Sequence, residues 1–473
     1  MALDTLVKNK HINKDIFKAY DIRGQIGKEW CSENNFHDAF LIGEAIGNQL
    51  LEQHSPNIII GRDGRLSSHD ISLQLIKGLL SSGCNVTDIG LTATPVVYFS
   101  LQSLNMTNAI MITGSHSPSD HNGIKIVFDS QPLSTSAIES LYFDISKNDY
   151  PIVKSGKLTA FDSANQHYQQ AVIKDITIQR KLRIGIDSSN GATSIFSEDL
   201  FNNLGCEVYP LFCELDGTFP NHSPDPTTPE NLTYLIKHVK ENNLDIGIAF
   251  DGDGDRMIAV DNLGNILWPD RIMILLAQSI LQSFPGSRIA YEIKCSYLLP
   301  KAIRKAGGQA AICANGHSKI KLEMKRLNAI MGGEFSGHII LRDRWNDFDD
   351  APYVAARLLE ILSKTTQSTA EVFAEIPNGF ATEEYKLKFA SHNESVELIT
   401  QFIKNASFPG ANLNLIDGLR VEYDDGWGFI HASNTSSSIG LRFEGATEER
   451  LLEIKKQFKA VFKLIDYKHP LPF

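Results

Sequence analysis

Three carboxylates stand at alternate positions in the segment Asp251-Gly-Asp253-Gly-Asp255-Arg256. The preceding residues, 246–250, form an apolar run that predicts a buried strand. Carboxylate oxygens are ligands suited to Mg²⁺, and the two glycines allow a turn tight enough for the acidic side chains to converge. Arg256 adds a planar guanidinium that suits phosphoryl oxygens. The spacing therefore predicts a metal site that acts on a phosphate.

Three other kinds of site could contain this segment. An EF-hand loop would need Gly at its sixth position and Glu at its twelfth, but Arg256 and Asn262 stand there, which disfavours it. A phosphatase with an aspartate nucleophile also places an acidic pair after a strand. A solvated acidic turn without a ligand is opposed by repulsion between its carboxylates. The last two interpretations stay open on this motif alone.

A second polar segment, residues 113–125, follows the apolar run 109–112 and contains a serine that could carry a phosphoryl group. Serine is a weak nucleophile unless a base and positive charge lie near it, and His116 and Lys125 are local candidates for those roles beside Ser115. The alternative is a hydroxyl that only caps the following turn. The segment by itself does not separate the two.

Composition limits the classes of partner. The chain has 473 residues, 42% of them hydrophobic and 21% charged, and a net charge of −11. This length predicts three or four domains, and the acidic balance disfavours nucleic acids and anionic membranes as partners. Six cysteines without a C-x-x-C pair indicate reduced thiols. With no apolar leader or membrane-length run, we expect a cytoplasmic protein.

Strand, loop and helix patterns recur along the chain, beginning at residues 57–64, 182–191 and 288–295. Their separation is that of domains, so we expect three related α/β units. After residue 380 the pattern changes to strands with Gly-rich turns and a final helix, which predicts a smaller α+β domain. Proline and glycine place the expected boundaries at 1–155, 156–263, 264–376 and 377–473.

Together, the serine and aspartate segments resemble the α-D-phosphohexomutase superfamily. Similar motifs run along nearly the whole chain: Ala19-Tyr20-Asp-Ile-Arg23-Gly24, Lys294-Cys-Ser296, Gly316-His317-Ser318, Gly332-Gly-Glu334-Phe-Ser336-Gly-His338 and Ser433-Asn434-Thr435. The first motif, with residues 216–226 and 344–350, resembles the bacterial phosphomannomutase/phosphoglucomutase branch. Phosphoglucosamine mutases typically have a Gly-Thr-Asp-Gly version of the first motif.

This resemblance implies four domains in a heart-shaped arrangement around a central cleft. It also implies reversible phosphoryl transfer between C1 and C6 of a hexose phosphate, of mannose or glucose, through a phosphoserine and a hexose 1,6-bisphosphate. Mg²⁺ is the implied metal, with the bisphosphate as intermediate and activator. The expected partners are small-molecule hexose phosphates, and we expect a monomer or weak oligomer.

The site residues implied by the resemblance fall into three groups. Ser115 carries the phosphoryl group, and Arg23, His116 and Lys125 supply proton transfer and charge. Asp251, Asp253, Asp255 and the phosphorylated Ser115 bind the metal. The substrate is bound by Tyr20, Arg256, Lys294, His317, Glu334, Ser336, His338, Ser433, Asn434 and Thr435.

One position departs from the family pattern. Relatives generally have Arg two residues before Ser433, whereas this chain has His431. Histidine supplies less charge at neutral pH and no bidentate fork, so we expect weaker phosphate binding or help from another cation such as Arg442.

Three alternative functions remain at this point: a phosphoglucosamine mutase, a Mg²⁺-dependent phosphatase that releases inorganic phosphate, and an inactive relative that only senses sugar phosphates. The last would lack the nucleophile or a metal ligand, and this sequence has both.

Overall fold

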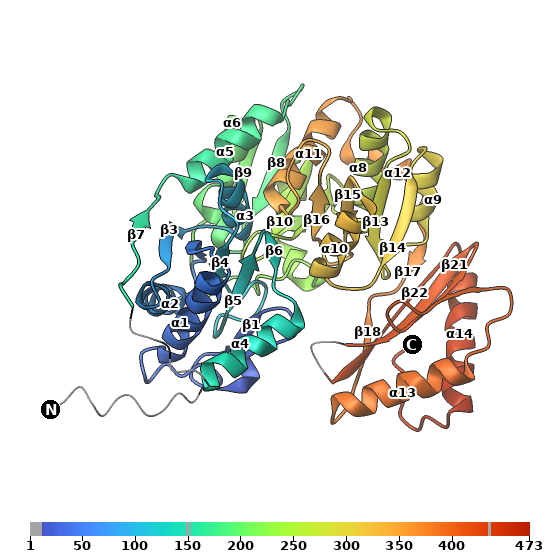
Figure 1. Cartoon of the computed structure of the whole chain (residues 1–473). Coiled ribbons are helices and arrows are strands. Elements are labelled where there is room, and N and C mark those ends of the chain that lie inside the picture. The colour runs from blue at the N-terminus through green and yellow to red at the C-terminus, as the bar shows by residue number, and fades with distance from the viewer. Residues whose placement is uncertain (1–11, 148–149, 151–152, 434–436) are drawn as a thin grey trace. The chain divides into compact units, whose positions relative to one another are not determined.

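The computed structural model describes residues 12–147, 150, 153–433 and 437–473 (Figure 1). The chain forms two compact units. Unit 1 comprises Met1–Leu267 and Phe348–Thr369, and unit 2 comprises Trp268–Asp347 and Ala370–Phe473. The described residues of each unit form two β-sheets. None of the described helices is long and apolar enough to span a bilayer.

The first sheet of unit 1 has the strand order β1-β5-β4-β2-β3-β7, with β6 on β5. Strands β4, β2, β3 and β7 run parallel to one another, whereas β5 is antiparallel to β1 and β4. The strands are β1 (Ile22–Gln25), β2 (Asn57–Arg62), β3 (Asn85–Leu91), β4 (Ala109–Ile112), β5 (His121–Phe128), β6 (Gln131–Pro132) and β7 (Leu158–Ala160), and the helices are η1 (Lys14–Ile16), α1 (His37–Glu52), α2 (Ser68–Ser81), α3 (Thr94–Ser103) and α4 (Thr135–Lys147).

The second sheet of unit 1 has the order β12-β11-β10-β8-β9. Every residue of β10 is buried, as the apolar run of the sequence predicts for a central strand. The strands are β8 (Arg183–Asp187), β9 (Glu207–Leu211), β10 (Ile246–Phe250), β11 (Met257–Asp261) and β12 (Ile266–Leu267), and the helices are α5 (Ala164–Asp175), η2 (Ala192–Ile195), α6 (Ser197–Asn203), η3 (Pro229–Leu232), α7 (Thr233–Glu241) and α11 (Ala351–Ser363).

Unit 2 contains a four-stranded sheet of order β14-β13-β15-β16 and a mainly antiparallel sheet of order β17-β22-β21-β20-β19, with β18 also on β22. The first sheet has β13 (Arg288–Glu292), β14 (Gln309–Cys313), β15 (Met331–Gly333) and β16 (Ile339–Leu341), with α8 (Pro269–Ser283), α9 (Leu298–Lys305), α10 (His317–Leu327) and α12 (Thr369–Ala374) nearby in sequence. The second has β17 (Phe380–Ala381), β18 (Tyr385–Lys388), β19 (Asn412–Asn414), β20 (Leu419–Tyr423), β21 (Gly426–Ala432) and β22 (Ser438–Gly445), with α13 (His392–Asn405) and α14 (Glu448–Leu464).

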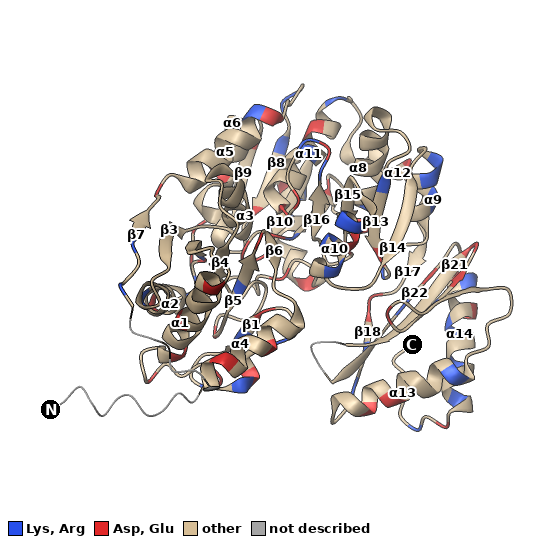
Figure 2. Cartoon of the chain, viewed as in Figure 1, with Lys and Arg blue, Asp and Glu red and all other residues tan. Residues whose placement is uncertain are grey.

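The expected strand starts near residues 57, 182 and 288 correspond to β2, β8 and β13, each of which is parallel to at least one neighbour. The expected final helix is α14, whose N-cap Thr447 accepts a hydrogen bond from the Arg450 N–H. Figure 2 shows acidic and basic residues interspersed along the helices of both units, so the net negative charge is not confined to one segment.

Candidate functional site

In unit 1 the serine loop (residues 113–121) meets the aspartate loop (residues 251–256). The two loops follow β4 and β10, which belong to different sheets of this unit. The Ser115 hydroxyl donates to Oδ2 of Asp251 at 3.2 Å, and His116 Nδ1 lies 3.2 Å from the same hydroxyl. The fold therefore brings the proposed nucleophile to the first proposed metal ligand across 136 positions of sequence.

Ser115 has a left-handed backbone conformation, with φ of 49°. A residue with a side chain reaches this region only with strain, so its surroundings must hold it there. Its N–H donates to Thr113 Oγ1 at 2.8 Å, and the side chain of Ser115 is almost fully buried. The hydroxyl is thus presented in a fixed direction from a sharp turn.

The aspartate loop curls around one of its own carboxylates. Oδ1 of Asp251 accepts the backbone N–H groups of Gly254, Asp255 and Arg256 at 2.9, 3.1 and 3.2 Å. Burial, together with the neighbouring carboxylates of Asp255 and Asp253, raises the pKa of Asp251 well above its usual range. A cation at this position would relieve the repulsion among three buried carboxylates.

The donor set fits a hard divalent cation. Asp251, Asp253 and Asp255 each offer an oxygen within 4.8 Å of the others. Oδ1 of Asp253 is buried and has no hydrogen-bond partner among the described residues. Thr94 on α3, which the sequence did not single out, donates from Oγ1 to the other oxygen of Asp253 at 2.5 Å. A cation would satisfy the remaining oxygen.

Lys125 on β5 points into the same cluster. Its Nζ lies 2.6 Å from Oδ2 of Asp253 and 2.5 Å from Oδ2 of Asp255. Burial would lower the pKa of Lys125, but these two carboxylates outweigh it and raise the pKa well above the usual lysine range. The ammonium is therefore charged and fixed beside the aspartate loop.

The remaining expected residues of unit 1 lie at the margins of this cluster. Arg23 on β1 reaches Ser117 Oγ at 3.4 Å and pairs with Asp21 at 2.5 Å. Arg256 Nε lies 3.8 Å from Oδ2 of Asp251. Tyr20, in the turn before β1, is half-buried.

In unit 2 the sugar loop (residues 332–338) closes the hairpin of β15 and β16, with the Glu334 N–H donating to the His338 carbonyl at 2.9 Å. The Ser336 hydroxyl donates to Oε2 of Glu334 at 3.1 Å, and His338 Nδ1 lies 2.8 Å from the same oxygen. Gly316 N–H donates to Oε1 of Glu334 at 2.8 Å. The expected sugar-binding residues therefore form one connected cluster.

Glu334 is ionised at neutral pH. Burial would raise the pKa of Glu334, but the hydrogen bond from His338 and the charges of His338 and His317 lower it to about 2. The rings of His317 and His338 stack with centroids 5.2 Å apart, which places both imidazoles beside this carboxylate. A permanent acceptor of this kind suits sugar hydroxyls.

Two glutamates that sequence reasoning did not identify flank Lys294. Its Nζ lies 3.4 Å from Oε1 of Glu292 and 3.8 Å from Oε1 of Glu384, and Glu384 in turn lies 3.2 Å from His431 Nε2. Glu292 is the last residue of β13, a position where ligand-binding residues gather in parallel sheets, and this signal was readable from the sequence. Glu384 does not stand at the end of a parallel strand, so its position in the sequence did not mark it.

A polar cavity of about 190 Å³ adjoins His431, and its walls include Lys294, Asn315, Glu384, Lys386, His431, Ser433, Ser438 and Gly440. Asn434 and Thr435 of the expected phosphate loop lie outside the described residues. Arg442, the suggested replacement cation, does not line this cavity. Its guanidinium packs 3.4 Å from the centroid of Phe335 and donates to the Lys294 carbonyl at 2.5 Å.

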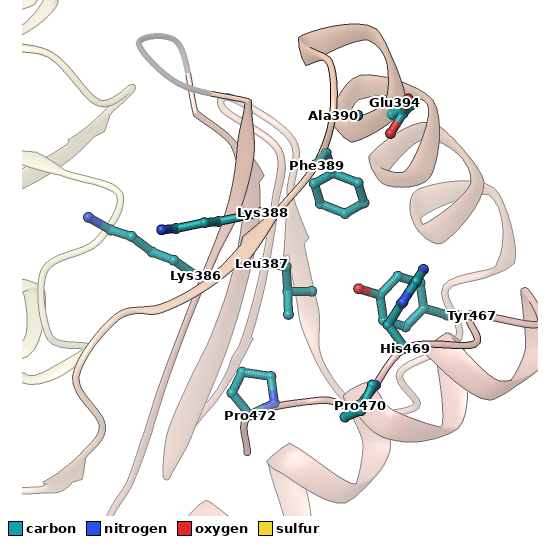
Figure 3. Close-up of a pocket in the computed structure, with 10 residues that line it drawn as sticks. All are labelled: Lys386, Leu387, Lys388, Phe389, Ala390, Glu394, Tyr467, His469, Pro470 and Pro472. Carbon is teal, nitrogen blue, oxygen red and sulfur yellow. The ribbon is translucent and has the colours of Figure 1, made fainter.

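A larger cavity of about 570 Å³ lies in the same unit between β18 and the C-terminal segment (Figure 3). Phe389, Tyr467 and His469 give it an aromatic wall, whereas Lys386 and Lys388 extend away from those rings. The smaller cavity, with its hydroxyl, imidazole and ammonium groups, is the better match for a phosphate.

Replacing Glu334 by Gln keeps the shape of the side chain and removes its charge. We expect kcat/KM for a hexose phosphate to fall about 10- to 100-fold, because a hydrogen bond to a charged group contributes about 1.5–3 kcal/mol. Glu323→Gln, on α10 of the same unit, is the matched control, since Glu323 pairs only with Arg326 among the contacts described here. Steady-state kinetics of both variants measure this difference in kcat/KM. Equal kcat/KM in the two variants would show that Glu334 does not bind the sugar.

Four family models match the chain in order. They are described as phosphoglucomutase/phosphomannomutase alpha/beta/alpha domains I, II and III and the C-terminal domain, and they match residues 14–151, 166–264, 268–380 and 388–461. These matches confirm the predicted fold of three α/β domains and a smaller C-terminal domain. The individual boundaries proposed from the sequence stay predictions.

Similar proteins extend over nearly the whole chain. A phosphomannomutase/phosphoglucomutase of Pseudomonas putida is 44% identical over 458 residues, covering 97% of each chain. A phosphoglucomutase of Neisseria meningitidis is 40% identical over 455 residues, covering 96% of this chain and 98% of its own. A crystal structure of a phosphoglucomutase/phosphomannomutase family protein from Burkholderia thailandensis is 37% identical and superposes with a TM-score of 0.91, covering 98% of this chain and 100% of that one.

Proposed function

The chain belongs to the phosphoglucomutase/phosphomannomutase family, and we propose that it moves a phosphoryl group reversibly between C1 and C6 of glucose and mannose phosphates. The observation that carries the proposal is the Ser115 hydroxyl, 3.2 Å from the first of three clustered carboxylates. A carrier oxygen and a cation site side by side are what phosphoryl transfer requires.

The transfer proceeds in two steps. Phosphorylated Ser115 gives its phosphoryl group to a free hydroxyl of the hexose monophosphate: the Oγ–P bond breaks, an O–P bond to the sugar forms, the sugar hydroxyl loses its proton, and Oγ of Ser115 takes one up. The hexose 1,6-bisphosphate then returns its other phosphoryl group to Ser115: the bond from that sugar oxygen to phosphorus breaks, the Oγ–P bond forms again, the serine hydroxyl loses its proton, and the sugar oxygen takes one up. The enzyme regains its phosphoserine and releases the isomeric monophosphate.

The chain's own residues orient and balance these steps. Lys125 is charged and held by Asp253 and Asp255, so its ammonium supplies positive charge and a proton donor near Ser115. His116 Nδ1 lies 3.2 Å from the Ser115 oxygen and exchanges a proton with it during transfer. Arg23 contributes charge through its contact with the serine loop, because a guanidinium does not deprotonate near neutral pH.

Asp251, Asp253 and Asp255, with an oxygen of phosphorylated Ser115, would hold Mg²⁺, which supplies charge neutralisation for phosphoryl transfer. The hexose 1,6-bisphosphate also acts as activator, since it restores the phosphoserine if it is lost. Glu334, Ser336 and His338 bind the sugar hydroxyls, and Lys294 with the cavity beside His431 binds the second phosphate. The protein works in the cytoplasm as a monomer or weak oligomer.

The test combines intact mass with product analysis. The protein is incubated with glucose 1,6-bisphosphate and then given glucose 1-phosphate or mannose 1-phosphate in the presence of Mg²⁺. We expect one added phosphoryl group on Ser115 and conversion of both sugars to their 6-phosphates. Release of inorganic phosphate without isomerisation would establish a phosphatase instead, and a preference for glucosamine phosphate would establish a phosphoglucosamine mutase.

The histidine at position 431 gives a specific prediction. His431→Arg should lower KM for a hexose phosphate about 3- to 10-fold, because arginine adds a permanent charge and a bidentate fork next to the polar cavity. The measurement is KM at neutral pH beside wild type. His469→Arg, in the aromatic cavity, adds the same charge elsewhere in the unit and should leave KM unchanged. Equal KM values for His431→Arg and wild type would mean that this cavity does not hold the phosphate.

A further inference from the structure

Arg65 is a buried arginine of unit 1 that the proposed chemistry does not use. It follows β2, which is parallel to β4 in the same sheet. Parallel neighbours end at the same edge of a sheet, so the segment after β2 and the serine loop after β4 meet there. Only about 2% of Arg65 is exposed, although arginine is among the residues least often buried.

All five N–H groups of the Arg65 guanidinium have an acceptor. Nε donates to Asp63 Oδ2 at 3.2 Å. The other four bonds go to backbone carbonyls of the serine loop: the acceptors, with their distances, are Ser115 at 2.6 Å, Ser117 at 2.7 Å, Pro118 at 2.5 Å and His121 at 2.9 Å. Since a guanidinium has five donors in a rigid plane, this one is fully used.

One of these acceptors is the carbonyl of the strained residue itself. Ser115 has φ of 49°, and Arg65 binds its carbonyl while Thr113 binds its N–H. Strained backbone persists only where several contacts over-determine it. Gly114 is needed for the same contact, because a Cβ there would lie 2.6 Å from Cζ of Arg65. The arginine therefore lies directly against the turn that presents the nucleophile.

A segment between β9 and η3 of the same unit covers the other side of the guanidinium. The Phe219 ring centroid lies 4.9 Å from Cζ of Arg65, and a Cβ on Gly217 would lie 2.8 Å from Cα of Arg65. Farther along this segment, the Pro224 carbonyl accepts the Gly252 N–H of the aspartate loop at 3.2 Å. The same segment thus touches both the arginine and the aspartate loop.

We propose that Arg65 is a positioning residue for phosphoryl transfer, which holds Ser115 in its left-handed turn so that the hydroxyl faces Asp251. It acts through the serine loop, whose carbonyls take up four of its donors. This inference rests on the proposed function, because it assigns Arg65 to the carrier role of Ser115. Lysine cannot replace it, since an ammonium has three donors and no fixed plane.

The test uses Arg65→Ala and Arg65→Lys in the full-length chain. Both variants should lose about 10²-fold in kcat, the effect of a misplaced reacting group, with little change in KM. Uptake of the phosphoryl group from glucose 1,6-bisphosphate, followed by intact mass, should slow by a similar factor. Added guanidinium, below concentrations that unfold the protein, should restore part of the activity of the alanine variant and none of that of the lysine variant.

Arg271→Ala is the matched control. Arg271 also donates to backbone carbonyls, those of Phe373 and Ile376, but it lies on α8 in unit 2. This variant should keep wild-type kcat and show no response to guanidinium. If the alanine variant at position 65 does not fold, the lysine variant, which keeps the charge and the aliphatic stem, is assayed in the same way.

Wild-type kcat in a folded Arg65 variant would overturn the proposal. So would a loss of kcat without guanidinium rescue in Arg65→Ala, if the hydrogen exchange of that variant over residues 113–121 equals that of wild type. Ser115→Ala distinguishes a failure of the proposed carrier mechanism from a failure of the role assigned to Arg65. An active Ser115→Ala enzyme would remove the carrier mechanism itself, whereas an inactive Ser115→Ala enzyme beside active Arg65 variants would remove only the role of Arg65.

Discussion

Ser115→Ala should lower kcat for the isomerisation of glucose 1-phosphate by about 10⁴-fold or more, the scale seen when a nucleophile is removed from an enzyme. We expect this because no other described hydroxyl has both the strained turn and the contact with Asp251 that Ser115 has. The protein should take up no phosphoryl group from glucose 1,6-bisphosphate, as intact mass would show. The control is Ser134→Ala, because Ser134 is an exposed residue of the same unit, between β6 and α4. This variant should behave as wild type.

Excess bisphosphate makes this result decisive. A sugar bisphosphate that is added in large amount cannot replace a missing carrier oxygen, so activity of the alanine variant should stay low at every concentration. Full turnover by Ser115→Ala would show that the phosphoryl group travels by another route.

Asp251→Asn has the second largest effect, and its sign differs between activity and stability. Loss of one metal ligand should lower kcat about 10³-fold, since a bound metal contributes several kcal/mol of charge stabilisation. In chelator, however, the melting temperature should rise by about 2 °C. Burial and two neighbouring carboxylates raise the pKa of Asp251, so the metal-free fold disfavours its ionised form, and the uncharged amide removes that cost at neutral pH.

The pH dependence follows from the same shift. A carboxyl whose pKa is raised on folding contributes stability at low pH and loses that contribution as the pH rises through its folded pKa. In chelator, the gain in melting temperature from Asp251→Asn should therefore vanish in acid and appear as the pH approaches neutrality. Differential scanning calorimetry with and without Mg²⁺ measures this, with Asp129→Asn, an exposed position, as control. A lower melting temperature for Asp251→Asn in chelator at neutral pH would contradict the expected repulsion.

Much of the site could be predicted from short segments of the sequence. The alternate aspartates after an apolar strand predicted a cation site, and the structure places their oxygens within reach of one ion. The family resemblance was confirmed by the four domain matches. Individual roles of the site residues remain proposals until the variants are measured.

Two of the missed residues have one cause in common. Arg65 and Glu384 carry no motif around them that names a chemistry, and an isolated charged residue in a sequence is more often a solvated surface group. Their importance comes from burial and from partners far along the chain: Arg65 bonds across about fifty positions, and Glu384 meets His431 across 47. Arg442 shows the converse, since its sequence position suggested a phosphate cation, but stacking on Phe335 occupies it.

By itself, the sequence determined the α/β class, the order of the motifs and the chemistry of the aspartate and serine segments, because spacing within a few residues fixes which side chains share a turn. Only the tertiary structure decided that Lys125 pairs with Asp253 and Asp255 and that Lys294 lies between two glutamates. It also decided that Arg65 donates hydrogen bonds to the carbonyls of the serine loop. Those contacts depend on which strands are neighbours and on how loops from separate sheets pack. Burial then determines which charges must be paired, and short-range sequence patterns do not encode it.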